Sequence, residues 1–98
     1  MYILEVLSGP LDGETWEFER EITIGRDGEV AEACITLDQF VSRRHARLWD
    51  DDGRLVLTDL SSRNGTQVEG KPVKTDVALA VGDCFLIGRT LLRVTRSA

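Results

Sequence analysis

The sequence has few of the residues that build metal sites, disulfide frameworks or membrane spans. It contains one histidine and two cysteines, Cys34 and Cys84, which are too few ligands for a four-coordinate zinc site. We expect both cysteines to be buried thiols rather than a disulfide or a metal pair. The longest stretches without Asp, Glu, Lys or Arg are six residues long, 6–11 and 77–82, too short for a transmembrane helix. The sequence therefore predicts no metal, no cofactor and no membrane insertion.

Signals for export and for bulk binding to polyanions are also lacking. Residues 1–5 carry neither a basic leader nor an uninterrupted apolar segment, so we expect a cytoplasmic setting. The net charge is −5, which argues against a protein that coats nucleic acid. Among the 12 cations only Lys71 and Lys74 are lysines. The rest are arginines, whose guanidinium groups match two-pronged anions such as phosphate, so a basic site must be local.

The 98 residues allow one hydrophobic core, and we predict a single, monomeric domain over residues 1–98, either alone or as a module of a longer protein. Turn signals recur at short intervals, and strand-sized segments lie between them. Trp16 and Phe18 alternate with polar residues, and only residues 29–33 could form a helix, of barely one turn. The fold class predicted is all-β, with two packed sheets. Further strands are expected at residues 2–7, 46–50, 54–59, 84–87 and 90–95. The strands at 46–50 and 54–59 are expected to form a hairpin.

Three predicted loops, at residues 25–26, 42–45 and 61–66, concentrate polar chemistry. They contain hydroxyl groups, one amide and four cations, but no carboxylate. A phosphate monoester carries about −1.5 to −2 charges and three acceptor oxygens, which Arg, Ser and turn N–H groups can satisfy. The loops therefore suggest an anion site. Its four cations are Arg26, Arg43, Arg44 and Arg63.

The order of these motifs resembles the forkhead-associated (FHA) domain. Gly-Arg at 25–26, Ser-Arg-Arg-His at 42–45 and Ser-Arg-Asn-Gly at 62–65, with Val-Glu-Gly at 68–70, follow the family pattern G-R … S-R-x-H … S-x-N-G-x-x-V-N-G. The resemblance implies a sandwich of about eleven short strands in two mostly antiparallel sheets, with the ligand loops at one end. Glu69 departs from the family's Asn and either alters that turn or only keeps it polar.

The resemblance also implies a function, which is phosphothreonine-dependent peptide or protein binding in Ser/Thr-kinase signalling. Threonine is selected over serine in the family by a pocket for the methyl group. By analogy, Arg26, Ser42 and Arg43 hold the phosphate, Asn64 contacts the peptide main chain and Arg63 lines the same groove. The residues expected to support the site from behind are Gly25, His45 and Gly65.

Simpler roles remain open for each of these residues. Arg26 could pair with a neighbouring carboxylate, and Ser42 could only cap a turn. Asn64 and Gly65 are first of all a tight-turn signal, and a lone His at the start of an apolar strand is usually a hydrogen-bonded core residue. Of the two adjacent arginines, Arg44 is the one expected to point into solvent.

Other functions find less support in the sequence. An enzyme with Ser42 as nucleophile and His45 as base lacks a nucleophile elbow, and strand alternation separates the two side chains. Neither nucleotide-binding glycine motif occurs. The alternative is an FHA-fold scaffold that binds its partner without phosphate, which predicts a damaged phosphate site.

Overall fold

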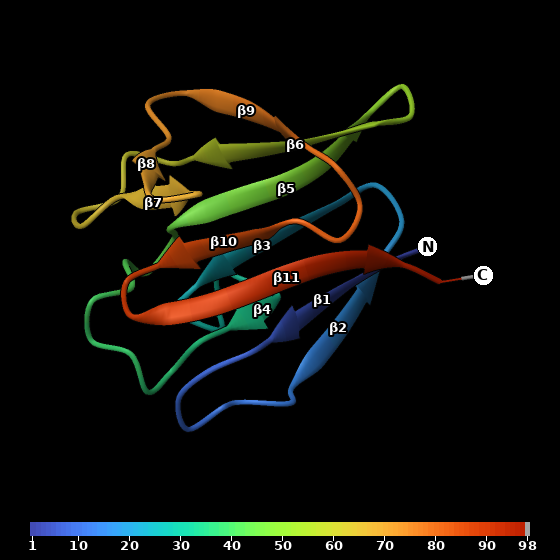
Figure 1. Cartoon of the computed structure of the whole chain (residues 1–98). Helices are drawn as coiled ribbons and strands as arrows, with labels where there is room; N and C mark the ends of the chain where they lie inside the picture. Colours follow the sequence, from blue (N-terminus) through green and yellow to red (C-terminus); the bar gives the residue numbers. More distant parts are fainter. Residues whose placement is uncertain (98) are drawn as a thin grey trace.

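The computed structural model describes residues 1–97, which form eleven β-strands and no helix. The strands make two sheets that lie against each other (Figure 1). The spatial order of the first sheet is β2 (Thr15–Phe18), β1 (Tyr2–Val6), β11 (Thr90–Arg96), β10 (Cys84–Ile87), β7 (Thr66–Val68) and β8 (Lys71–Pro72). That of the second is β4 (Ala33–Cys34), β3 (Glu21–Gly25), β5 (Ala46–Asp51), β6 (Arg54–Asp59) and β9 (Asp76–Leu79). Among the strand pairs of residues 1–97, only β3–β4 is parallel. Eleven strands in two mostly antiparallel sheets confirm the predicted all-β fold class.

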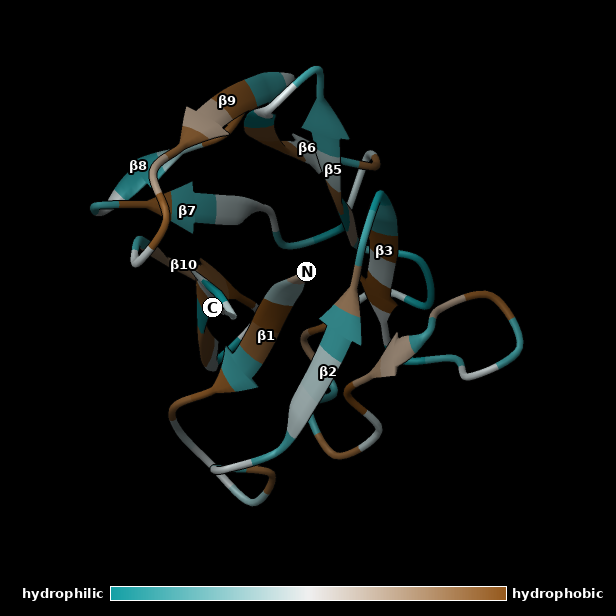
Figure 2. Cartoon of the chain, turned by 90° about the vertical axis from the view of Figure 1, so that its right-hand side faces the viewer, coloured by the Kyte–Doolittle hydropathy of each residue, from teal (hydrophilic) through white to brown (hydrophobic). Residues whose placement is uncertain are grey.

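Each sheet buries one face because successive side chains of a strand point to opposite sides. In β1, Tyr2, Leu4 and Val6 are buried, and the two residues between them are half-exposed. Figure 2 shows hydrophobic residues recurring along β1 and β3. Buried side chains from both sheets form one continuous cluster. This core makes the sandwich a rigid frame from which the loops project.

The two ends of the sandwich differ in what they carry. At one end the termini meet, since the Ser97 N–H donates to the Met1 carbonyl at 3.0 Å. In Figure 1 this end lies at the right. The β4–β5 loop, the β6–β7 loop and the β10–β11 turn lie at the opposite end, at the left. Segments far apart in the sequence therefore gather at one end.

The predicted strands and the predicted hairpin are confirmed, with ends that differ by one residue at most. The segment at 29–33, which alone could form a helix of barely one turn, does not form one: a single turn lies there, in which the Asp27 carbonyl accepts from the Val30 and Ala31 N–H groups. It cannot grow, because Ala33 already pairs with β3 as part of β4.

The expectation that both cysteines are buried is also wrong. Both thiols are free, but Cys34 is half-buried and Cys84 is exposed. In β10, Phe85 and Ile87 face the core, so strand alternation turns Cys84 outward.

Two negative findings hold for the part of the chain that the structure describes. No helix there is long and apolar enough to cross a membrane. No three His, Cys, Asp or Glu side chains in those residues lie close enough together to hold a metal ion.

Candidate functional site

A hollow of about 270 Å³ lies at the loop end of the sandwich. Three of its lining residues are arginines, and none is a carboxylate. In a chain with a net charge of −5, this is a local concentration of positive charge. The lining residues come from the loops after β3, β4 and β6, and they are Arg26, Gln39, Phe40, Val41, Ser42, Arg43, Arg63 and Asn64. The structure thus brings together all five residues that the sequence nominated for phosphopeptide contact.

Arg26 reaches the hollow because β3 ends, at Gly25, against the β4–β5 loop. The Arg26 N–H donates to the Ser42 carbonyl at 2.9 Å, and the Asp27 N–H donates to the Arg43 carbonyl at 3.3 Å. A Cβ atom on residue 25 would lie only 2.0 Å from the Arg43 carbonyl oxygen. The two loops can approach this closely only because residue 25 is glycine.

Two side chains are oriented by carbonyl groups of the β4–β5 loop. Arg26 Nε donates to the Val41 carbonyl, and Asn64 Nδ2 donates to the Phe40 carbonyl, both at 2.9 Å. The Nε bond fixes the guanidinium plane and leaves the terminal nitrogens of Arg26 for another acceptor. Asn64 likewise keeps its side-chain oxygen and a second N–H. Both residues are exposed, so these groups are open to a ligand.

The hydroxyl of Ser42 joins two of the loops. Its Oγ accepts a hydrogen bond of 2.9 Å from the Arg63 N–H. Since the hydroxyl serves as acceptor in this contact, its own proton remains available to an anion. Arg43 is exposed and lines the hollow, whereas Arg44, also exposed, does not line it.

His45 lies behind the hollow and is fully buried. Its Nδ1 accepts from the Ser42 N–H at 3.0 Å, so the ring proton sits on Nε2, which donates to the Gly65 carbonyl at 2.9 Å. Burial lowers the pKa of His45, against the raising effect of the Gly65 carbonyl and of two carboxylates, Asp59 and Asp38. The neutral ring therefore connects the loop after β4 with the loop after β6.

Asp59 shapes the β6–β7 loop that presents Arg63 and Asn64. Its carboxylate accepts from the Ser62 N–H at 3.0 Å, the Ser62 hydroxyl at 2.5 Å and the Thr66 hydroxyl at 2.7 Å. Burial raises the pKa of Asp59, but these hydrogen bonds outweigh it and hold the pKa below its ordinary value. The Ser62 hydroxyl also accepts from the Gly65 N–H at 3.0 Å, where Gly65 adopts φ +87°.

Sequence reasoning missed several residues of this end of the molecule. Gln39, Phe40 and Val41 line the hollow, and their only signal was their position just before Ser42. Asp38 was also missed. Its carboxylate accepts from the N–H groups of Phe40 and Arg89 and from the Thr90 hydroxyl, and it thereby ties the β4–β5 loop to the β10–β11 turn.

Comparisons with known proteins agree with this architecture. Residues 22–88 match the family model of the FHA domain. The chain is 38% identical over 88 residues to the oxoglutarate dehydrogenase inhibitor of Corynebacterium diphtheriae, covering 89% of this chain and 59% of that protein.

Solved structures give the same result. An FHA domain from Chlamydia trachomatis superposes with a TM-score of 0.90 at 27% identity and covers 99% of this chain and 98% of that one. Another similar structure comes from a structural and functional analysis of phosphothreonine-dependent FHA domain interactions; its TM-score is 0.85 at 32% identity, with 99% and 97% of the two chains covered.

Proposed function

Because the chain belongs to the FHA domain family, we propose that it binds partner proteins through phosphothreonine, with the phosphate in the hollow at the loop end. FHA domains are binding modules rather than catalysts. The observation that carries the proposal is the composition of the hollow, which combines three arginines with a serine hydroxyl and lacks any carboxylate. A doubly charged phosphate is the ligand that such donors match best.

Each residue has a role in this proposal. The terminal nitrogens of Arg26, the hydroxyl proton of Ser42 and the guanidinium of Arg43 hold the phosphate oxygens. Asn64 hydrogen-bonds the peptide main chain with the groups that the Phe40 carbonyl leaves free. Arg63 lines the groove beside them. Gly25, His45 and Gly65 support the loops from behind. The proposed partner is a cytoplasmic protein phosphorylated on threonine by a Ser/Thr kinase.

The test is calorimetry with matched peptides that differ only in phosphorylation. An oriented phosphothreonine library first supplies a peptide that binds. We expect the phosphorylated form to bind and the unphosphorylated form to bind at least about 100-fold more weakly, because a charged contact of this kind contributes several kcal/mol. The phosphoserine form should bind more weakly than the phosphothreonine form. Equal affinity for the phosphorylated and unphosphorylated forms would instead favour the phospho-independent scaffold.

A further inference from the structure

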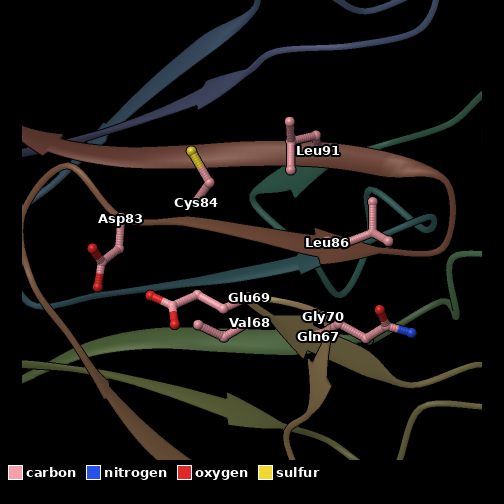
Figure 3. Close-up of a pocket in the computed structure, with 8 residues that line it drawn as sticks. All are labelled: Gln67, Val68, Glu69, Gly70, Asp83, Cys84, Leu86 and Leu91. Atoms are coloured by element: carbon pink, nitrogen blue, oxygen red, sulfur yellow. The ribbon is translucent and has the colours of Figure 1, made fainter.

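A second groove lies on the outer face of the six-stranded sheet (Figure 3). Its volume is about 340 Å³, and none of its lining residues also lines the phosphate hollow. It is built from β7, the β7–β8 turn, the end of the β9–β10 loop, β10 and the start of β11. The lining residues are Gln67, Val68, Glu69, Gly70, Asp83, Cys84, Leu86 and Leu91.

Part of this groove is apolar because of the strand register. Phe85 and Ile87 face the core, so Leu86 of β10 faces outward. Leu86 lies directly opposite Leu91 of β11, and Leu91 is 36% exposed. Two neighbouring leucines on an outer face leave apolar surface in contact with water, and covering it would be favourable by about 25 cal/mol per Å².

The other end of the groove is acidic. Figure 3 shows the carboxylates of Glu69 and Asp83 toward one end of the groove and the two leucines toward the other. The ion pairs among residues 1–97 are Arg47 with Glu21 and Arg93 with Glu5, so neither groove carboxylate has a cation within 4 Å.

Two basic residues of the sheet lie near the groove. Lys71 follows the β7–β8 turn and is paired with Val68 in the register, and none of the ion pairs of residues 1–97 involves it. Arg93 is paired opposite Cys84 in the register, and it is already neutralised by Glu5 at 2.7 Å. The acidic end of the groove is therefore free to attract a cation from another molecule.

The backbone conformation at Glu69 also indicates a role for its carboxylate in the groove. Glu69 has φ +52° and Gly70 has φ +76°, so both residues of this hairpin turn lie in the left-handed region. Asn-Gly is the favoured pair for such a turn, and for other residues the left-handed conformation costs about 1–2 kcal/mol. Glutamate at this position therefore destabilises the turn locally, but its carboxylate lines the groove.

We propose that this groove is a second docking surface, which binds a partner segment carrying an apolar side chain beside a Lys or Arg. The apolar side chain packs on Leu86 and Leu91, and the cation lies between Glu69 and Asp83. The charge is the reverse of that in the phosphate hollow, so the two surfaces select different parts of a ligand. The proposal does not depend on phosphothreonine binding.

The first test selects a phage-displayed library of random, unphosphorylated 12-residue peptides on the folded Arg26→Ala chain. This variant weakens the phosphate hollow and leaves the groove intact. We expect enrichment of peptides that place Lys or Arg next to an aliphatic or aromatic residue. Enrichment without that pairing, or no enrichment, would overturn the proposal.

The two free thiols then report where a synthetic copy of an enriched peptide binds. Cys84 lines the groove, whereas Cys34 lies on β4 and lines neither site. We expect the peptide to slow iodoacetamide alkylation of Cys84 at least fivefold, measured by mass spectrometry, and to leave the rate at Cys34 unchanged. Equal effects on the two thiols, or no effect at Cys84, would contradict binding in the groove.

Surface variants complete the test. Glu69→Gln and Leu91→Lys change exposed side chains and should each weaken the peptide at least tenfold, while Glu17→Gln on β2, also exposed, should not. Phosphothreonine-peptide binding should be unchanged in Glu69→Gln and Leu91→Lys. Failure of the groove proposal and failure of the proposed phosphothreonine binding therefore give different results. A dimer of the peptide-free chain in sedimentation equilibrium, dissociated by Leu91→Lys, would overturn the proposal and assign the groove to a second copy.

Discussion

The loop end and the outer face of the six-stranded sheet are built by different means. The hollow at the loop end, which we propose binds phosphate, takes its residues from three loops, and its shape depends on buried contacts behind it, such as the two hydrogen bonds of His45. The sheet groove takes most of its residues from paired strands, and its shape follows from strand register. Under the two proposals, binding at the loop end is therefore sensitive to changes at a distance, whereas binding on the sheet face depends on local side chains.

The charges of the two surfaces are opposite as well. Arg26, Arg43 and Arg63 line the hollow, while Glu69 and Asp83 line the groove. Acidic residues outnumber basic residues in this chain. Two carboxylates in one groove are therefore not unusual, whereas three arginines in one hollow are a local concentration of the rarer charge. Changes at one surface should therefore leave binding at the other intact.

The largest effect should come from removing one guanidinium from the hollow. Arg26→Ala should weaken phosphothreonine-peptide binding by roughly 2–5 kcal/mol, as the loss of one partner from a close charge pair does. Calorimetry measures this change. Arg44→Ala is the matched control, because Arg44 is an exposed neighbour that does not line the hollow; it should change the affinity by less than about 1 kcal/mol. Similar losses in both variants would mean that only the overall charge of the loop end matters.

The next effect should come from adding one methyl group behind the hollow. Gly25→Ala places a Cβ 2.0 Å from the Arg43 carbonyl oxygen, so we expect the free energy of unfolding to fall by about 2–4 kcal/mol. Phosphopeptide binding should weaken with it, because the loops must separate. At Gly28 a Cβ would meet its nearest atom, Cys34 Sγ, at 3.6 Å, which is ordinary contact. Urea unfolding of Gly28→Ala should therefore show a change of less than about 1 kcal/mol, and equal destabilisation of the two variants would refute the close-packing argument.

Acid should destabilise the folded chain through His45, which lies behind the hollow at the loop end. Burial lowers the pKa of His45 below its ordinary value near 6.5, so the unfolded chain takes up a proton more readily than the folded chain. Neutral His45 therefore makes its full contribution to the free energy of unfolding above pH 6.5. As the pH falls below 6.5, this contribution declines by at most about 1.4 kcal/mol per pH unit.

Urea unfolding between pH 7 and pH 5 measures this dependence. His45→Gln, which does not titrate, should show a shallower slope. The neighbouring carboxylates Asp38 and Asp59 have pKa values lowered from 3.8, so they stay ionised throughout this range. Parallel curves for the two proteins would show that protonation of His45 does not limit stability.

The smallest effect should come from the β7–β8 turn, and there stability and peptide affinity should change in opposite directions. Glu69→Asn relieves the unfavourable φ of +52° and should raise the free energy of unfolding by about 0.5–1 kcal/mol. It should also weaken the groove for a basic peptide. Glu17→Asn, on strand β2, serves as control and should not stabilise the protein, because Asn is disfavoured in strands. A loss of stability on Glu69→Asn would contradict the strain assigned to this turn.

Much of the architecture could be predicted from local sequence patterns. The turn signals and the alternation in segments such as β1 and the β5–β6 hairpin are properties of neighbouring residues, so they predicted the strands correctly. The ordered Arg, Ser and Asn motifs also nominated a set of residues that the structure gathers in one hollow. Residue types alone could not distinguish the inward from the outward face of β10, so the exposure of Cys84 was missed.

The remaining features of the hollow depend on contacts between distant residues. Sequence gave no sign that the carbonyls of Phe40 and Val41 would orient Asn64 and Arg26. Asp38 looks like an ordinary loop residue, yet it contacts Arg89 and Thr90 about half the chain away. These partners are set by the packing of the two sheets rather than by any local pattern.

By itself the sequence determined an all-β chain with arginine-rich loops, because turn propensity, side-chain alternation and charge are local properties. Tertiary structure decided which donors remain open for a ligand, which His45 nitrogen carries the proton and which outward side chains form the groove. A hydrogen-bonding group is committed or free only once its neighbours in space are known, and here those neighbours come from strands and loops far apart along the chain.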